Sequence, residues 1–402
     1  MRILVVADGL EPLLHHTVVG LADRGHEVRV IGAASDSELD PQARYRLGSR
    51  LRVTADRDSS STWATAARTA TALGRVMTRN PAAAGSIIRS TRSSMGPGPD
   101  FRRHIAAVLP VLAERPDVVY FEAAYVAAEV ASVLEHLPPY VVMCTGSDVR
   151  ILPEFNRTLR RMLPAVFAGA ARIVCRSEDL REWALRHGAL PQRTTVLYPA
   201  VELDKFAPAS TSGRRSGPMR IVSVGRLHWV KGYDYAVQAM HLALGKGHDV
   251  TYTIVGRDDG AGQAVDIAIR DLGLGEWVRR IGVKDAVGVA RSLARSDVFV
   301  LPSVAEGVSR AALEAMAVGL PVITTDAGGM TEVITDGVEG IVVPQRDPAA
   351  LADAIGVLAG DPDRRAAMSA RAVERARDFD ATAHLDRLEV LLTEIAEVRV
   401  SH

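Results

Sequence analysis

Apolar and polar residues alternate along the chain in two distinct patterns. Short, nearly continuous apolar runs predict buried strands, and longer segments with apolar residues at every third or fourth position predict helices. In the first half a helix is predicted over 13–25, ending at Gly25. Strands are predicted there at 2–7, 27–32, 117–122, 140–144, 172–175 and 195–198. Strands of this kind, separated by helices, are typical of a parallel sheet that is covered on both faces.

The composition changes over 207–218, where APASTSGRRSGP is small, polar and rich in the residues of linkers. Beyond it the alternation begins again, with helices predicted over 233–246, 261–273 and 309–318, and strands at 220–225, 250–256, 278–282, 297–302 and 321–325. The C-terminal segment again has a helical period. We therefore predict two α/β domains, an N-terminal one over 1–206 and a C-terminal one over 207–379.

The amino-acid composition of the chain limits the classes of function that it can have. The 402 residues contain 48 Lys+Arg and 48 Asp+Glu, so no excess charge indicates a nucleic-acid partner. The two cysteines, Cys144 and Cys175, end strand-like runs and are expected to pack in the core, which suits a reducing compartment. The first segment is predicted to be a strand rather than a signal peptide, and no apolar run is long enough to span a bilayer. We expect a cytoplasmic protein, with association at the inner face of a membrane left open.

The segment 59–99 has five arginines and no acidic residue. One interpretation is an insertion of solvated helices. The other is an acceptor-side lid or a basic surface in peripheral contact with anionic lipid headgroups.

Several common sites are absent from the sequence. It contains no G-x-G-x-x-G, no P-loop and no H-E-x-x-H motif. Asp-x-Asp occurs at Asp56/Asp58 and at Asp361/Asp363, but neither pair follows a predicted strand, and the second is typical of a helix start. We predict no metal site.

Two cations follow the first predicted strand of the second domain. In VGRLHWVKG (224–232), Gly225 lets the chain turn, Arg226 leaves the carboxyl end of the strand, and Lys231 comes five residues later. Ligands of open α/β sheets bind beyond the carboxyl ends of the strands. The pair therefore suits a phosphate, the alternative being two solvated loop cations.

The stretch AEGVSR (305–310) leads from a predicted strand into a helix. Gly307 allows close backbone approach, and the N–H groups of Val308, Ser309 and Arg310 would be donors at a helix N-terminus, which attracts anions. Glu306 and Glu314 could accept hydrogen bonds from hydroxyls. The alternative is a cap at Glu306 and an exposed charge at Glu314, although a carboxylate in an apolar run usually has partners. Together with the two cations, these groups predict a site for a nucleoside diphosphate that carries a sugar.

The sequence resembles the retaining GT-B glycosyltransferases of family 4 (glycosyl transferases group 1) over nearly its whole length. GRLHWVKG is similar to that family's G-R-L-x-x-x-K-G, and Glu306 and Glu314 match its E-x7-E signature. The resemblance continues through GLPVITTDAGGMTEVITDGVEGIVV (319–343). In the first half RGHEVRV, VCRSEDLREW and LYPAVELDKF resemble family segments more loosely.

This resemblance implies an α/β fold of the GT-B type, two Rossmann-like domains facing each other across a cleft, with the helix at 380–402 packing back on the first. It implies that Arg226 and Lys231 bind the diphosphate and that Glu306 holds sugar hydroxyls, so these three carry catalysis. The other donor-binding positions that it implies are Gly9, Gly225, Gly256, Val283, Lys284, the backbone of Gly307, Val308, Ser309 and Arg310, and Glu314, which holds the ribose.

The first domain is expected to bind the acceptor. Two of its positions differ from the family pattern: Asp8-Gly9 replaces a Gly-Gly loop, and Thr145 stands where a histidine is common. The acceptor-side candidates, on predicted strand ends or adjacent helices, are His15, His16, Glu122, Thr145 and Asp148.

The implied reaction is transfer of a sugar, with retention, from a nucleotide sugar (UDP- or GDP-linked) to an acceptor hydroxyl, without a metal or other cofactor. The acceptor is either a lipid-linked saccharide or a small molecule such as a natural product. Two alternatives stay open: a nucleotide-sugar epimerase or hydrolase of the same fold, and a catalytically silent sugar-nucleotide binding partner.

Overall fold

The computed structural model describes residues 1–7, 12–32, 50–55, 115–208 and 217–398, together with Leu47 and Val76. Asp8, Gly9, the Asp56/Asp58 pair and, apart from Val76, the segment 59–99 lie outside these residues. The chain divides into two compact units. Unit 1 comprises Met1–Leu197 and Leu385–His402, and unit 2 comprises Tyr198–His384. The first division therefore falls after Leu197 rather than after residue 206.

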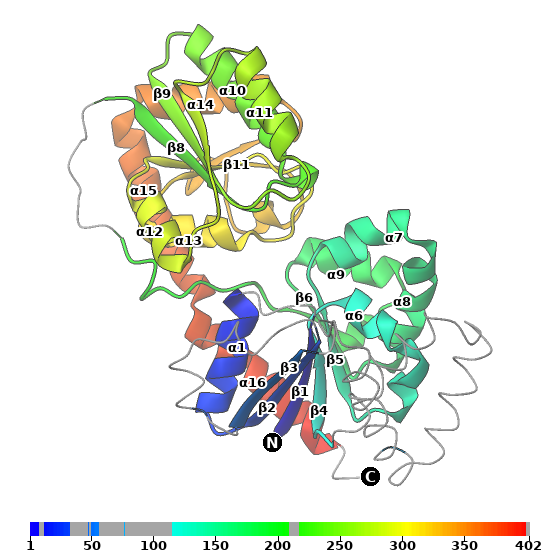
Figure 1. The fold of residues 1–402 in the computed structure, drawn as a ribbon. Helices are drawn as coiled ribbons and strands as arrows, with labels where there is room; N and C mark the ends of the chain where they lie inside the picture. The colour runs from blue at the N-terminus through cyan, green and yellow to red at the C-terminus, as the bar shows by residue number, and fades with distance from the viewer. Residues whose placement is uncertain are drawn as a thin grey trace. The chain divides into compact units, whose positions relative to one another are not determined.

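Unit 1 is built on a parallel sheet of seven strands in the order β3-β2-β1-β4-β5-β6-β7 (Figure 1). The order reverses between β1 and β4, as in dinucleotide-binding folds. Valine and isoleucine dominate these strands and suit a pleated, buried surface. The strands are β1 (Arg2–Ala7), β2 (Glu27–Gly32), β3 (Leu51–Ala55), β4 (Val118–Phe121), β5 (Tyr140–Cys144), β6 (Arg172–Cys175) and β7 (Thr194–Val196).

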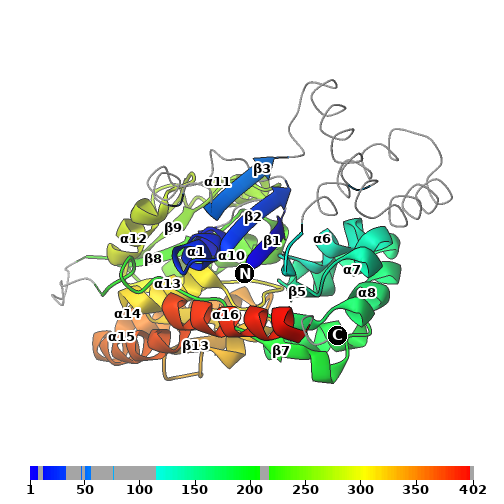
Figure 2. The ribbon, with the colours of Figure 1, turned by 90° about the horizontal axis from the view of Figure 1, so that it is seen from below.

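Helices cover both faces of this sheet. Leu4 and Val6 of β1 pack in one core cluster with α6 and α8, whereas Ile3 and Val5 pack in another with α1 and α16. The two views in Figures 1 and 2 show α16 beside the sheet. The α-helices are α1 (Pro12–Asp23), α6 (Ala124–Glu129), α7 (Leu152–Phe155), α8 (Arg157–Gly169), α9 (Glu178–Arg186) and α16 (Ala381–Val398). Shorter turns are the 3-10 helices η3 (Ala131–His136) and η5 (Pro191–Arg193) and the π-helix η4 (Ser147–Ile151).

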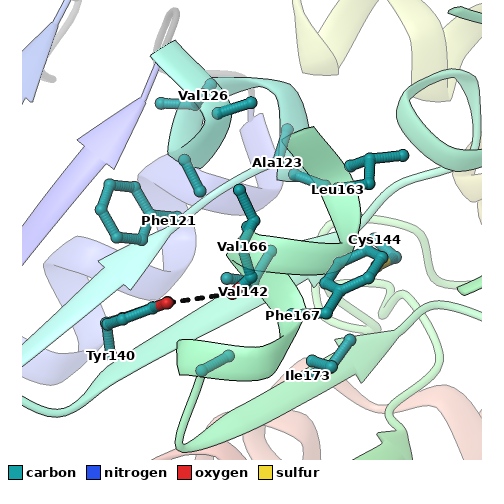
Figure 3. Close-up of a cluster of buried hydrophobic side chains, with 14 of the residues drawn as sticks. Phe121, Ala123, Val126, Tyr140, Val142, Cys144, Leu163, Val166, Phe167 and Ile173 are labelled. Carbon is teal, nitrogen blue, oxygen red and sulfur yellow. Dashed lines mark hydrogen bonds between the residues drawn. The ribbon is translucent and has the colours of Figure 1, made fainter. Parts of the chain in front are cut away.

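An aromatic pair anchors α8 to the sheet (Figure 3). The rings of Phe121 and Tyr140 meet edge to face with centroids 5.7 Å apart. The Tyr140 hydroxyl donates to the carbonyl oxygen of Val166 at 2.9 Å. This bond satisfies the hydroxyl, which is the one polar atom of the buried side chain. Tyr140 therefore packs in the core without losing a hydrogen bond. Cys144 and Cys175, register partners on β5 and β6, are buried and free, as expected.

From Leu385 onward, helix α16 belongs to unit 1 although it follows unit 2 in the chain. Its Leu388 and Leu392 are 1% and 0% exposed in the core cluster of β1 and α1. At the rim of this contact Arg24 Nη1 and His26 Nε2 both lie 2.6 Å from the Glu389 carboxylate. Apolar burial and charge pairing therefore both fix the helix to this unit.

Unit 2 repeats the architecture with a six-stranded parallel sheet in the order β10-β9-β8-β11-β12-β13. Its strands are β8 (Met219–Val224), β9 (Val250–Val255), β10 (Val278–Ile281), β11 (Val298–Leu301), β12 (Val322–Thr325) and β13 (Gly340–Val343). The covering helices are α10 (Tyr233–Gly245), α11 (Gly262–Asp271), α12 (Ala286–Ala294), α13 (Arg310–Val318), α14 (Pro348–Gly360) and α15 (Pro362–Ala376), with the 3-10 turns η6 (Trp229–Lys231), η7 (Gly329–Glu332) and η8 (Arg377–Phe379).

Helix starts in unit 2 follow ordinary capping chemistry. Asp361 precedes Pro362 and accepts a hydrogen bond from the Arg364 N–H at 2.9 Å, so the D-P-D sequence is a helix start, as predicted. Within the described part of the chain, no helix is long and apolar enough to cross a bilayer. No group of three or more His, Cys, Asp or Glu residues there could hold a metal ion.

Candidate functional site

The two motifs of the second half meet where the strand order of unit 2 reverses. β8 pairs in parallel with β11, while the next strand in the chain, β9, lies on the other side of β8. The loop after β8 (225–232) and the loop after β11 (302–309) therefore leave neighbouring carboxyl ends. The Val304 N–H donates to the Val230 carbonyl at 2.8 Å and joins the two loops. This reversal point is where open α/β sheets bind ligands.

The loops after β8 and β11 approach each other so closely that position 232 must be a glycine. Its φ of 63° lies in the left-handed region, and a Cβ here would fall 2.1 Å from the Pro302 carbonyl oxygen. A side chain would therefore clash with backbone that cannot move aside. The glycine of the K-G motif thus fixes the position of Lys231 relative to the loop after β11.

Lys231 and Glu306 form an ion pair at this point. Lys231 Nζ lies 2.5 Å from Glu306 Oε2, and the two side chains are 17% and 14% exposed. The Ser303 hydroxyl donates to the same carboxylate oxygen at 3.1 Å. A lysine ammonium has three donors, so the contact with Glu306 leaves donors for a further anion. Ser303 was not predicted. Its only sequence signal is its position two residues after the buried strand β11.

Arg226 has a different carboxylate partner. Its Nη1 lies 2.7 Å from Asp259 Oδ2, and its side chain is half-exposed. Asp259 comes from the loop after β9, the strand beside β8. The sequence predicts one pyrophosphate between Arg226, Lys231 and the start of α13. The structure places Arg226 toward the β9 loop and Lys231 toward the β11 loop, each held by a carboxylate.

Helix α13 begins close to the predicted position. Ser309 is its N-cap and accepts a hydrogen bond from the Ala312 N–H at 3.4 Å. The Ser309 N–H points to the sulfur of Met330 at 3.2 Å, and thioether sulfur is a weak acceptor. One of the three amides predicted to hold an anion is therefore directed at Met330. Gly307, Val308 and Ser309 are all buried.

Glu314 is buried in α13, not exposed on it. The residue is 8% exposed, and its Oε1 lies 3.1 Å from Arg310 Nε one turn earlier. Burial raises the pKa of Glu314 to about 7; the Arg310 charge opposes the shift and the nearby Glu202 adds to it. The interpretation of Glu314 as a solvated helix charge is therefore wrong. Glu202 precedes the first strand of unit 2 and lies in the LYPAVELDKF segment of the family resemblance, but it was not predicted as a site residue.

Two further donor-side predictions follow β9 and β10. A Cβ on Gly256 would lie 1.8 Å from the Gly225 carbonyl oxygen, so the loops after β8 and β9 pack backbone against backbone. Val283 and Lys284 are exposed in the loop after β10. Since β10, β9 and β8 are neighbours, these positions share the carboxyl edge of the sheet with Arg226.

The acceptor-side candidates that the structure describes lie in unit 1. Glu122 and Thr145 directly follow the neighbouring strands β4 and β5, and His15 and His16 lie on α1, the helix after β1. The parallel order β1-β4-β5 brings the carboxyl ends of these three strands to one edge of the sheet.

Asp148 has a structural role. It is completely buried, and its carboxylate accepts from the backbone N–H groups of Ala124, Thr145 and Gly146 at 2.9–3.0 Å. Burial raises the pKa of Asp148, against the effect of these N–H groups. The residue thus ties the loop after β5 to the start of α6 and positions Thr145.

Comparison with known proteins agrees with this architecture. Residues 7–205 match the family described as Glycosyltransferase Family 4, and residues 218–361 match the family described as Glycosyl transferases group 1. The chain belongs to the family 4 glycosyltransferases. The Arg226-to-Gly232 and Glu306-to-Glu314 motifs, which the structure brings to one sheet edge, both lie within the second match.

Curated relatives of this family cover part of the chain. A D-inositol 3-phosphate glycosyltransferase of Kribbella flavida is 30% identical over 50% of this chain and 51% of its own length. The amylovoran biosynthesis glycosyltransferase AmsK of Erwinia amylovora is 31% identical over 53% of each chain. The chain spans about half the length of these curated relatives.

Solved structures match the fold over almost the whole chain. HepE of Anabaena in complex with UDP-glucose aligns with a TM-score of 0.72 at 18% identity, covering 100% of both chains. Sucrose-phosphate synthase of Thermosynechococcus elongatus aligns with a TM-score of 0.74 at 16% identity, covering 99% of this chain and 100% of its own. The fold is therefore the two-domain α/β GT-B fold, as the resemblance implied.

Proposed function

We propose that the protein transfers a glycosyl unit, with retention, from a nucleoside-diphosphate sugar to an acceptor hydroxyl. The observation that carries the proposal is the Lys231–Glu306 ion pair at the reversal point of the unit 2 sheet, beside the start of α13. It combines a cation suited to a phosphate with a carboxylate suited to sugar hydroxyls, which is the pairing that a sugar diphosphate requires.

Breaking the bond between sugar and phosphate leaves negative charge on the terminal phosphate. Lys231 supplies a fixed positive charge that stabilises this charge more strongly in the transition state than in the ground state, and Arg226 supplies a second charge from the β9 side. The carboxylate of Glu306 accepts hydrogen bonds from sugar hydroxyls and holds the anomeric carbon in place. With these charges in place the proposal requires no metal ion and no other cofactor.

The donor is proposed to be a UDP- or GDP-sugar. Solved structures of the neighbour HepE are in complex with UDP and with UDP-glucose, which supports a uridine donor here. Glu314 is the carboxylate proposed for the ribose diol. Unit 1 is proposed to bind the acceptor at the strand ends that carry Glu122 and Thr145, with a lipid-linked saccharide or a small molecule as the acceptor class.

Replacing Lys231 tests the catalytic assignment. Lys231→Ala should lower kcat by about a hundredfold to a thousandfold, because it removes a charge that acts on the leaving group. Release of nucleoside diphosphate from a panel of UDP- and GDP-sugars, with candidate acceptors, measures it. Lys246→Ala, which removes an exposed lysine paired with Asp353 on α14, is the matched control and should keep the wild-type rate.

Product analysis separates the proposal from its rivals. Proton NMR of the product should show the anomeric configuration of the donor. Epimerised sugar formed without any acceptor would instead indicate an epimerase. Unchanged turnover in Lys231→Ala would overturn the assignment of the site.

A further inference from the structure

An exposed patch lies where α7 meets α8 in unit 1. Figure 1 shows the position of these two helices. We name it the Phe155 patch, and its members are Leu152, Phe155, Arg157, Arg160 and Arg161. Phe155 is 80% exposed and Leu152 is 37% exposed. The three arginines are also exposed. An aromatic ring with so little cover, beside a second apolar side chain, marks a surface that contacts another body.

The three arginines lie near the positive end of a helix. They occupy the first two turns of α8, whose inner face is buried through Leu159 and Leu163, and no acidic residue lies in the first turn. The positive end of the helix dipole repels Arg157 in the first turn, but this effect fades beyond one turn, where Arg160 and Arg161 stand. The stability of the helix therefore does not explain an arginine at position 157.

The cationic and apolar parts of the patch are contiguous. Asn156 alone separates Phe155 from Arg157, and Arg160 Nη2 lies 3.8 Å from Glu154 Oε1, the carboxylate next to Phe155. Glu154 is the one acidic residue between positions 152 and 161, against three arginines. The patch thus combines apolar side chains with net positive charge over less than three turns of chain.

We propose that the Phe155 patch docks unit 1 on an anionic phospholipid surface. Phe155 and Leu152 enter the headgroup region, and the guanidinium forks of the arginines bind lipid phosphates. An anionic lipid surface offsets two unfavourable features of the patch, because it covers the exposed ring and neutralises the positive charge at the start of α8. The patch follows β5 at the same sheet edge as Thr145, so docking brings that edge to the membrane. The proposal does not depend on glycosyl transfer.

Vesicle co-sedimentation of the full chain tests the proposal. The probes are vesicles of phosphatidylcholine alone and of phosphatidylcholine with phosphatidylglycerol. The chain should bind the anionic vesicles at low salt and be released at high salt. Phe155→Ser should weaken binding by about tenfold. The triple variant Arg157→Gln, Arg160→Gln and Arg161→Gln should weaken it by about a hundredfold, at roughly fivefold for each arginine near the surface.

Matched controls keep the same chemistry at other sites. Val390→Ser removes a side chain of α16 that is 58% exposed but lies beside Glu389. Replacing the exposed Arg364, Arg371 and Arg377 of unit 2 by Gln removes the same charge. Both controls should bind as the wild type does. The basic segment 59–99 is unchanged in every variant, so a selective loss reports the Phe155 patch.

Three outcomes overturn the proposal: no binding by the wild type, equal binding to neutral and anionic vesicles, or equal loss in the patch and control variants. A fourth outcome comes from sedimentation velocity, which measures self-association of the wild type and of Phe155→Ser. If the wild type does not bind vesicles but Phe155→Ser abolishes self-association, the patch contacts a second copy of the chain instead.

Discussion

The two buried carboxylates Asp148 and Glu314 have different surroundings and therefore different roles. Asp148 accepts from three backbone N–H groups, so its charge is matched by fixed dipoles of the loop that it holds. Glu314 has one guanidinium partner, Arg310, and a second carboxylate, Glu202, nearby. The first is a satisfied structural group. Burial raises the pKa of both acids, but only at Asp148 do three N–H groups oppose the shift, and at Glu314 the nearby Glu202 adds to it, which makes Glu314 sensitive to pH and to a ligand.

Glu314 should make the protein less stable as pH rises from about 4.5 to about 7. Its pKa is raised from 4.5 to about 7, so between these values the folded state binds more protons than the unfolded state. The stability that this proton contributes is present below pH 4.5 and is lost as pH rises toward 7. The loss amounts to roughly 3 kcal/mol by pH 8.

Urea unfolding at pH 5 and pH 8 measures this effect. Wild-type stability should fall between the two values by more than that of Glu314→Gln, which cannot ionise. Glu374→Gln, at an exposed glutamate of α15, should keep the wild-type profile. An identical pH dependence in wild type and Glu314→Gln would show that Glu314 does not titrate in this range.

Single residues were the hardest features to predict. The family motifs located Lys231 and Glu306, but nothing in the sequence indicated that these two pair with each other, or that Arg226 pairs with Asp259. Such partners come from loops on different strands, so they depend on the strand order. The pairing of Asp148 with the N-terminus of α6 is non-local in the same way, and it turned a candidate acceptor residue into a support for Thr145.

At the scale of elements, the contact between Gly225 and Gly256 fixes how the β8 and β9 loops pack. Gly256→Ala would place a Cβ 1.8 Å from the Gly225 carbonyl oxygen, against backbone rather than against a mobile side chain. We expect a loss of about 1–3 kcal/mol in the stability of unit 2, together with weaker donor binding, because the loop that carries Arg226 must shift.

Thermal unfolding and binding of UDP, followed by calorimetry, check this prediction. Gly275→Ala is the matched control, because a Cβ there would meet no atom within 4 Å. If Gly256→Ala and Gly275→Ala behave alike in both measurements, the close approach of the two loops is not important for the site.

Elements with a continuous apolar pattern were predicted well. β1, β2, β5 and β6 have the predicted bounds, and the other predicted strands differ by at most two residues at an end. β3 and β13 were missed. β3 lies at a sheet edge and alternates arginine and threonine with apolar residues. β13 begins at a glycine. Neither sequence therefore contains the continuous apolar run that predicts a buried strand. The short α7 and the π-helix η4 lack a periodic pattern because each spans about one turn.

At the scale of the whole molecule, the two units have separate cores. Leu392 of α16 is completely buried in unit 1, and Leu358 of α14 is completely buried in unit 2. Leu392→Ala should destabilise unit 1 by about 2–5 kcal/mol through lost burial and a cavity, and Leu358→Ala should do the same to unit 2. Interfaces between domains of one chain are usually weaker than the cores, so each effect should stay within its unit.

Hydrogen exchange with mass spectrometry separates the two responses, because each peptide belongs to one unit. Leu392→Ala should speed exchange in β1 and α1 but not in β8 and α10, and Leu358→Ala should do the reverse. Uniformly faster exchange in both variants would mean that the chain unfolds as one cooperative block.

The place of α16 in the chain has a consequence for protein synthesis. The apolar face of unit 1 that this helix covers is translated first, but its cover leaves the ribosome only after all of unit 2. At about 5–20 residues per second, the roughly 190 intervening residues take on the order of 10–40 s. Throughout that interval the nascent first unit presents uncovered valine and leucine side chains, so a ribosome-associated chaperone should hold this polypeptide longer than one whose halves are completed in turn.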